Sequence, residues 1–190
     1  NGATWSPQPQ PVHPEPRARH AFAWDSHRQR GVMFGGIKNA VPLGDTWEWN
    51  GLAWSPVQPA TSPSVRFSSS MVFDAAHQAM TLYGGHNGAG TRFFTDTWAF
   101  DGGTWHQVTT NAIGERVRAS TSWDSDRQRV VLVGGEAPAS TTLELDDTWE
   151  FDGTTWLKKT PAQSPPGRAQ HAMATLNSKV YLYGGRGPLG

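Results

Sequence analysis

The sequence contains no cysteine, which excludes disulfide bonds, thiolate nucleophiles, cysteine-ligated zinc and iron–sulfur clusters. Charge is sparse and balanced, because 16 basic and 16 acidic residues give a net charge of zero. Such a chain lacks the one-sided positive field that nucleic-acid binding requires. Purely apolar runs are only a few residues long, as at residues 130–133, so no membrane-spanning helix is expected. We therefore expect neither nucleic acid nor a membrane as a partner.

Glycine, proline and tryptophan are abundant instead, with 21, 14 and 10 copies among 190 residues. This composition is typical of an all-β protein with many turns. The length is sufficient for one unit with a sizeable buried core. The cellular location stays open, with a secreted or periplasmic one favoured.

A repeat of about fifty residues organises the whole chain. A double glycine recurs four times, and an Asp-Thr-Trp segment recurs three times with a second tryptophan seven residues after the first. The double glycines are Gly35-Gly36, Gly84-Gly85, Gly134-Gly135 and Gly184-Gly185; the Asp-Thr-Trp segments are residues 45–47, 96–98 and 147–149; the second tryptophans are Trp54, Trp105 and Trp156, with Trp5 as a fourth copy. Such a period indicates a repeat architecture.

Each unit is predicted to form four short strands. The first strands are residues 19–24, 68–73, 118–123 and 170–175, and the second are residues 32–34, 81–83, 131–133 and 181–183. The second strands are apolar without alternation, which indicates burial on both faces. The third and fourth strands form hairpins around Asn50-Gly51, Asp101-Gly102 and Asp152-Gly153, dipeptides that suit a type I′ turn.

The double glycine that closes the second strand, the aromatic residue of the third and the tryptophan of the fourth resemble the kelch repeat. The resemblance covers essentially the whole chain and implies a β-propeller of four-stranded antiparallel blades. Repeats fall at approximately residues 17–54, 66–105, 116–156 and 168–190, and residues 1–5 are a leftover fourth strand. We therefore predict an all-β, kelch-like propeller or propeller section with three complete blades and one split or partial blade.

Three interpretations of the split blade stay open: a section of a longer propeller, a partial ring completed by a second copy, and a self-contained four-bladed ring. An unpaired apolar strand at residues 181–183 would recruit another chain. We expect this edge to be covered by the N-terminal strand, by a second copy or by residues absent from the sequence, and Trp5 to be buried as Trp54 is.

The repeated residues are interpreted first as structural. All ten tryptophans lie on the repeat, so we expect packing roles, and truncation of Trp98 or Trp149 should be costly. The double glycines are expected where the backbone needs a positive φ or a close neighbour.

The connections between blades and between the second and third strands are long and irregular, among them residues 37–44, and they emerge on one face. Variable loops on a regular scaffold are where binding residues are expected. Arginines that begin each unit on this face either pair with Asp45, Asp96 and Asp147, within a blade or between blades, or face a carboxylate or sugar ligand. The predicted ligand-binding residues are Arg17, Arg19, His20, Arg66, His86, Asn87, Arg92, Phe93, Phe94, Arg116, Arg118, Arg168 and His171.

No catalytic residue, metal ligand or cofactor site is predicted, because the seven histidines show no metal-ligand spacing and no nucleophile motif occurs. Galactose oxidase shares the kelch architecture, but its cofactor needs a tyrosine crosslinked to a cysteine, which this chain lacks. The resemblance favours a non-enzymatic binding module for a protein or glycan. The alternatives are a secreted sugar-active enzyme similar to the kelch-type sialic acid mutarotases and a self-assembling propeller scaffold.

Overall fold

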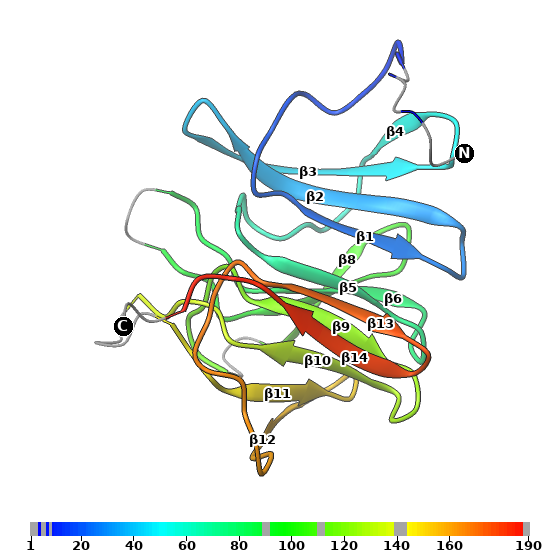
Figure 1. The fold of residues 1–190 in the computed structure, drawn as a ribbon. Helices are drawn as coiled ribbons and strands as arrows, with labels where there is room; N and C mark the ends of the chain where they lie inside the picture. Colours follow the sequence, from blue (N-terminus) through cyan, green and yellow to red (C-terminus); the bar gives the residue numbers. More distant parts are fainter. Residues whose placement is uncertain are drawn as a thin grey trace.

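The computed structural model describes residues 4, 7, 9–88, 92–109, 113–138 and 144–187. These residues form antiparallel sheets and no helix (Figure 1). Three sheets have four strands and one has two, and within each sheet the strands follow in chain order. The predicted all-β architecture, with three complete blades and one partial blade, is confirmed.

The strand bounds are as follows. The first blade has β1 (Ala21–Asp25), β2 (Arg30–Lys38), β3 (Val41–Trp49) and β4 (Trp54–Val57); the second has β5 (Ser70–Asp74), β6 (Ala79–Tyr83), β7 (Thr97–Phe100) and β8 (Trp105–Thr109); the third has β9 (Ser120–Asp124), β10 (Arg129–Val133), β11 (Thr148–Phe151) and β12 (Trp156–Lys159); the fourth has β13 (Ala172–Leu176) and β14 (Lys179–Tyr183).

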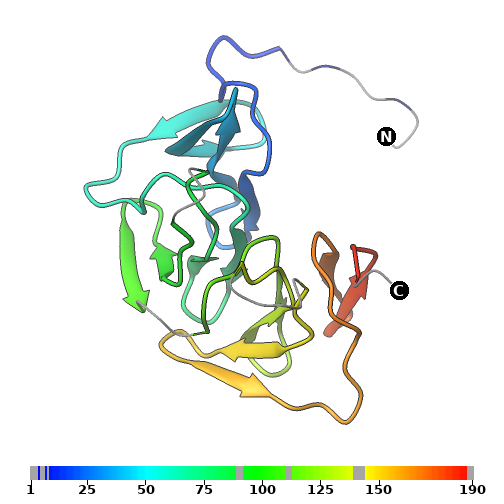
Figure 2. The ribbon, with the colours of Figure 1, turned by 90° about the vertical axis from the view of Figure 1, so that its left-hand side faces the viewer.

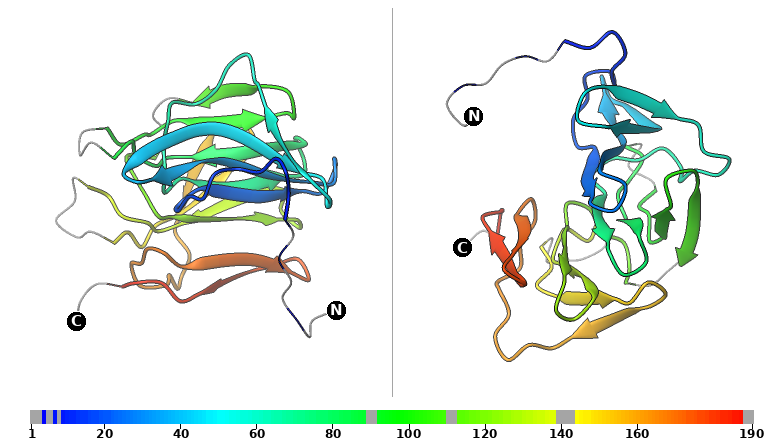
Figure 3. Two further views of the ribbon diagram at one scale, coloured as in Figure 1. Left: turned by 90° about the horizontal axis from the view of Figure 1, so that it is seen from above. Right: turned by 90° about the vertical axis from the view of Figure 1, so that its right-hand side faces the viewer.

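The sheets stand side by side in an arc around one axis, with β1, β5, β9 and β13 innermost (Figure 3, right). Each inner strand contacts the inner strand of the next blade. The arc is open between the first and the last sheet, as the side view in Figure 2 also shows. The fold is therefore a row of propeller blades with two free ends.

The core lies between blades. One cluster joins Ala21, Val32 and Phe34 of the first blade to Met71, Phe73 and other residues of the second. The second strands β2, β6 and β10 are buried along most of their length, as their unbroken apolarity predicted. Alternate residues of one blade thus face opposite neighbours, so each complete joint between blades is an apolar interface.

Positive φ values occur at all four double glycines, which confirms the prediction for them. Gly84 illustrates why glycine is required, since a Cβ there would lie 2.6 Å from the carbonyl oxygen of Arg116 in the next blade. A close approach between blades, as well as the backbone turn, therefore selects glycine at this position.

Two features differ from the sequence prediction. Residues 37–44 of the first blade are not an irregular loop, because β2 and β3 continue as a hairpin whose turn residues Asn39 and Ala40 have φ values of 48° and 65°. The inner strands also begin two residues later than predicted. The residues predicted to start them, such as Arg19 at φ 56°, lie in the left-handed region, which interrupts an extended strand.

The last blade ends on an exposed strand. β14 pairs only with β13 among the described residues, and the side chain of Tyr183 is 86% exposed. The predicted cover of this edge is therefore not provided by the described part of the chain. Trp5, whose burial was also predicted, lies outside the described residues.

Candidate functional site at the mouth of the central channel

The arginine that begins each complete blade makes a bidentate ion pair with an aspartate of the same blade. Arg66 donates from Nη1 and Nη2 to the two carboxylate oxygens of Asp96, at 2.6 and 2.9 Å, and also from Nη1 to the carbonyl of Gly84 at 3.1 Å. The other pairs are Arg17 with Asp45 and Arg116 with Asp147. Of the two roles considered for these arginines, the structure shows the pairing, and it lies within a blade.

The arginine side chains of these ion pairs are buried. The side chains of Arg17, Arg66 and Arg116 are 3%, 0% and 2% exposed. Burial alone would raise the pKa of Asp96, but the hydrogen bonds and charge of Arg66 outweigh it and hold the pKa below its ordinary value. The pKa of Asp147 is lowered against burial in the same way by Arg116. These guanidinium groups therefore stabilise the fold and are not available to a ligand.

Arg168 occupies the same place in the fourth blade in a different environment. It donates to the carbonyls of Gly184 and Pro166, and no carboxylate pairs with it among the described residues. The first three blades take this carboxylate from the third strand, and the described fourth blade consists of β13 and β14 alone. Arg168 is therefore a partly exposed cation at the free end of the arc.

The residue after each double glycine lies at the channel mouth and differs in every blade. Short antiparallel bridges join it to the residue three positions before the inner strand, which brings the two sets of loops to one end of the arc. These residues are Ile37, His86, Glu136 and Arg186. Only His86 was predicted as a site residue. The signal for Glu136 and Arg186 was the variation at an otherwise repeated position.

Two arginines flank this mouth with different partners. Arg118 donates to Glu136 at 2.5 Å, and Glu136 also accepts from Arg186 at 2.9 Å. Arg19 is exposed, and its guanidinium lies 5.8 Å from the ring centre of Phe67. Arg19 has no carboxylate partner among the described residues, so it remains available to an anion.

A cavity of about 330 Å³ lies along the inner strands just below the mouth, lined by residues of all four blades. His20, Ser70 and Thr121 belong to this lining. His20 Nδ1, Ser70 Oγ and Thr121 Oγ1 are buried polar atoms that have no hydrogen-bond partner among the described residues. Buried polar atoms without partners are uncommon in folded proteins.

The histidines near the channel favour the neutral form. Burial lowers the pKa of His20, and the charge of Arg17 adds to this effect. Burial likewise lowers the pKa of His171, with a further contribution from Arg168. At neutral pH these imidazoles are uncharged and can both donate and accept hydrogen bonds.

The predicted aromatic loop of the second blade divides into a packed and an accessible part. Phe94 is buried under the guanidinium of Arg66, at 3.9 Å from ring centre to Cζ, so its role is packing. Phe93 stacks on His86 at 5.3 Å between ring centres, and His86 contacts Phe67 at 4.0 Å. Asn87 and Arg92 are joined by a backbone hydrogen bond beside this stack. Phe93 and His86 are partly exposed beside the mouth.

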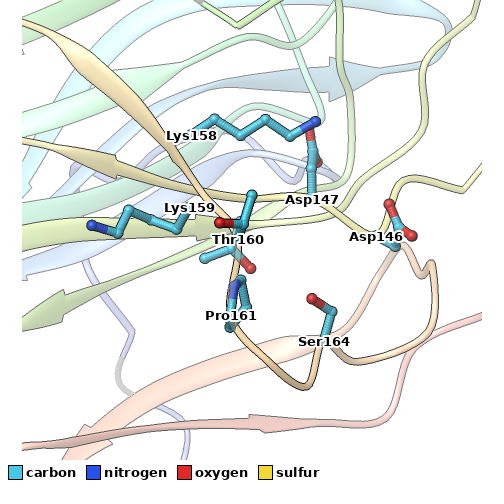
Figure 4. Close-up of a pocket in the computed structure, with 8 residues that line it drawn as sticks. Asp146, Asp147, Lys158, Lys159, Thr160, Pro161 and Ser164 are labelled. Atoms are coloured by element: carbon cyan, nitrogen blue, oxygen red, sulfur yellow. The ribbon is translucent and has the colours of Figure 1, made fainter.

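A second, smaller cavity of about 210 Å³ lies at the outer strands β11 and β12 of the third blade (Figure 4). Asp147, Thr148 and Lys158 are among its lining residues. In the first two blades, the threonine equivalent to Thr148 accepts a hydrogen bond from a tryptophan of the next blade. This cavity is therefore the counterpart of a joint between blades and not a separate ligand site.

No group of residues suited to bind a metal ion occurs in the part of the chain that the structure describes. Among the same residues, no helix is long and apolar enough to cross a membrane.

Four-stranded antiparallel blades around a channel, with loops gathered at one mouth, define the class of β-propellers. Within this class, the chain matches the family described as the KLHDC2/KLHL20/DRC7 Kelch-repeats domain over residues 1–185. The chain therefore belongs to the kelch-repeat propellers.

Among solved structures, the chain is similar to one titled "Structure of YjhT", with a TM-score of 0.70 and 19% sequence identity. The similarity covers 90% of this chain and 60% of that one, so the chain spans about three fifths of the length of this structure. At this identity the likeness supports the fold alone. No curated protein matches the sequence.

Proposed function

We propose that the chain is a non-enzymatic binding module that takes an acidic glycan at the mouth of its central channel. The observation that carries the proposal is the exposed side chain of Arg19, which has no carboxylate partner among the described residues, next to a cavity that residues of all four blades line. A carboxylate would pair with Arg19, and sugar hydroxyls would lie against the lining of the cavity, which includes the polar residues His20, Ser69 and Ser120.

The surroundings support a small, polar ligand with one apolar face. The cavity is of the size that holds a small molecule. The His86–Phe93 stack offers ring faces beside the mouth, against which the C–H face of a sugar can pack. The Glu136 carboxylate is neutralised by Arg118 and Arg186, so the anion at the mouth does not repel an acidic ligand.

Saturation-transfer NMR and calorimetry with glucuronic acid and N-acetylneuraminic acid, against neutral glucose, test this proposal. We expect the acidic sugars to bind and Arg19→Gln to weaken their binding at least tenfold. The matched control is Arg30→Gln, because Arg30 is also unpaired with any carboxylate among the described residues but begins β2 at the opposite end of the blade. Equal affinity for glucose, or no effect of Arg19→Gln, would contradict the proposal.

The same experiments address the two other candidate functions. An acidic peptide that binds while the sugars do not would favour a protein ligand. Interconversion of the sugar anomers faster than in buffer, followed by NMR, would favour a sugar-active enzyme. Either result would contradict the proposal that the chain binds an acidic glycan without converting it.

A further inference from the structure

His86 is the middle residue of three short chain segments that lie side by side at the mouth. Antiparallel bridges join it to Phe67 in one segment and to Phe93 in the other. Side chains of residues paired in this way lie next to one another on the same face. Accordingly, the ring centre of His86 lies 4.0 Å from that of Phe67 and 5.3 Å from that of Phe93. The imidazole is therefore held between two phenyl rings.

This arrangement leaves the edge of the imidazole to meet a ligand, because the phenyl rings lie along its faces. Phe67 is only 3% exposed, so the imidazole packs on a ring that is itself fixed by burial. His86 is partly exposed, and no group among the described residues hydrogen-bonds its ring nitrogens. The ring face that this row offers to a sugar therefore belongs to Phe93, whereas His86 offers a nitrogen that can donate or accept a hydrogen bond.

Arginines of the two neighbouring blades flank the first of these segments. The backbone N–H of Ser68 donates to the carbonyl of Arg19 at 2.8 Å, and the carbonyl of Ser68 accepts from the N–H of Arg118 at 3.0 Å. The guanidinium of Arg19 lies 5.8 Å from the ring centre of Phe67, on which the imidazole packs. Arg118 is paired with Glu136, whereas Arg19 has no carboxylate partner among the described residues. An unneutralised positive charge therefore lies close to the imidazole.

The other charged groups on the segments around His86 leave the balance positive. Arg66, on the first segment, is neutralised by its bidentate pair with Asp96. Arg92, on the third segment, is exposed and has no carboxylate partner among the described residues. No acidic residue on these segments offsets it.

This surplus of positive charge favours the neutral imidazole in the absence of a ligand. Burial lowers the pKa of His86 below its ordinary value of 6.5, and the charges of Arg118 and Arg19 lower it further. Glu136 acts in the opposite direction, but it also accepts a hydrogen bond from Arg186. A carboxylate bound at Arg19 would cancel part of the repulsion and would accept a charge-assisted hydrogen bond from the imidazolium.

We propose that His86 contacts the acidic sugar through its ring edge and takes up a proton from solvent when the sugar carboxylate binds at Arg19. This inference rests on the function proposed above. Because the effects of two bound species on each other are reciprocal, protonation of His86 must raise the affinity for the carboxylate by the same factor. A sugar carboxylate stays ionised above about pH 5. Acidic sugars should therefore bind more tightly as the pH falls through the range in which histidine titrates, and neutral sugars should not.

Calorimetry of the full chain with glucuronic acid, at about pH 7.5 and about pH 5.5, tests this inference. We expect roughly fivefold tighter binding at the lower pH. Titrations near pH 6.5 in two buffers of different ionisation enthalpy should also show net proton uptake. His86→Gln and His86→Phe should each abolish both effects, although phenylalanine retains a ring between Phe67 and Phe93.

The matched control is His27→Gln, because His27 is an exposed histidine in the turn between β1 and β2, at the opposite end of the blade. This variant should keep the pH dependence and the proton uptake of the parent chain. Thermal melts at both pH values establish that every variant is folded under the conditions of the titrations.

NMR of the imidazole protons gives a second readout that needs no sugar. The pKa of His86 should be higher in Arg19→Gln than in the parent chain, since one repelling charge is removed. Glucuronic acid added to the parent should raise it as well. Binding of glucuronic acid with an affinity that does not change with pH, or a pH dependence that survives His86→Gln, would overturn this inference and leave the proposed function intact. Absence of binding at both pH values would refute the proposed function and this inference with it.

Discussion

The guanidinium of Arg66 and the carboxylate of Asp96 join the entry of the second blade to its third strand, through two hydrogen bonds of 2.6 and 2.9 Å. The side chains are 0% and 14% exposed. Removing one partner leaves a buried charge without its counter-ion, which is the costly way to break such a pair. The burial of this pair therefore predicts a large loss of stability when either partner is removed.

Arg66→Met should lower the free energy of unfolding by about 3–5 kcal/mol in denaturant titrations. Arg17→Met is the matched control, because the Asp45 carboxylate that it leaves behind is 41% exposed and water can solvate it. We expect the loss at Arg17 to be less than half of the loss at Arg66. Equal losses would show that burial of the aspartate does not determine the penalty.

Stability should also fall in mildly acidic solution because of the channel histidines. Burial, helped by Arg17 and Arg168, lowers the pKa of His20 and His171 below the ordinary value of 6.5. Between the lowered pKa of each histidine in the folded chain and its ordinary pKa of 6.5 in the unfolded chain, the unfolded chain binds more protons. The contribution of the neutral histidines to stability is therefore fully present above pH 6.5 and decreases as the pH falls below that value.

Unfolding titrations of the parent chain and of a His20→Gln, His171→Gln double variant between pH 7.5 and 5 measure this effect. The double variant should show a flatter dependence over this range. A further decrease shared by both proteins is expected below the ordinary aspartate pKa of 3.8, where the lowered pKa values of Asp96 and Asp147 cause stability to be lost on protonation. Identical profiles above pH 5 would contradict the role assigned to the histidines.

Trp98 should be among the most sensitive core positions. Its ring is 8% exposed in the joint between the first two blades, and its Nε1 donates to Asp96 at 2.7 Å. Trp98→Ala should cost about 3–5 kcal/mol, measured by thermal and denaturant unfolding. Leu157→Ala, at a side chain 62% exposed, should stay within about 0.5 kcal/mol. A cost at Trp98 below about 1 kcal/mol would contradict a packing role.

The repeat predicted the strands, the glycine geometry and the packing role of the tryptophans because each follows from a local pattern that recurs. The pairing of Arg66 with Asp96 was one of two roles that the sequence left open, because two strand spacings, roughly 10 Å, separate the two positions within a blade and only long side chains bridge that distance. Glu136 and Arg186 were missed for a related reason. Their position at the mouth depends on where each second strand ends in the assembled blades. A search for repeated residues does not detect a position that varies from repeat to repeat.

A hydrogen bond across the first joint gives a prediction with an internal control. Trp105 Nε1 donates to Thr46 Oγ1 at 2.9 Å, and both side chains are buried. Thr46→Val should cost about 1–3 kcal/mol, because the indole N–H loses its acceptor without gaining water. Thr148→Val should be nearly neutral, since no tryptophan donates a hydrogen bond to Thr148 among the described residues. Similar costs at the two sites would show that the threonine acts through its own strand alone.

Alanine substitutions at Gly84 and Gly184 distinguish the cost of backbone strain from the cost of a close contact between blades. Their φ values are nearly equal, 69° and 71°, so alanine should cost each about 1–2 kcal/mol for the left-handed conformation. At Gly84 a Cβ would also lie 2.6 Å from the carbonyl oxygen of Arg116, whereas at Gly184 no atom lies within 4 Å of it. Gly84→Ala should therefore lose about 1–3 kcal/mol more than Gly184→Ala, the usual cost of overpacking. Denaturant unfolding measures the difference, and equal losses would show that the close approach of the blades adds nothing to the requirement for glycine.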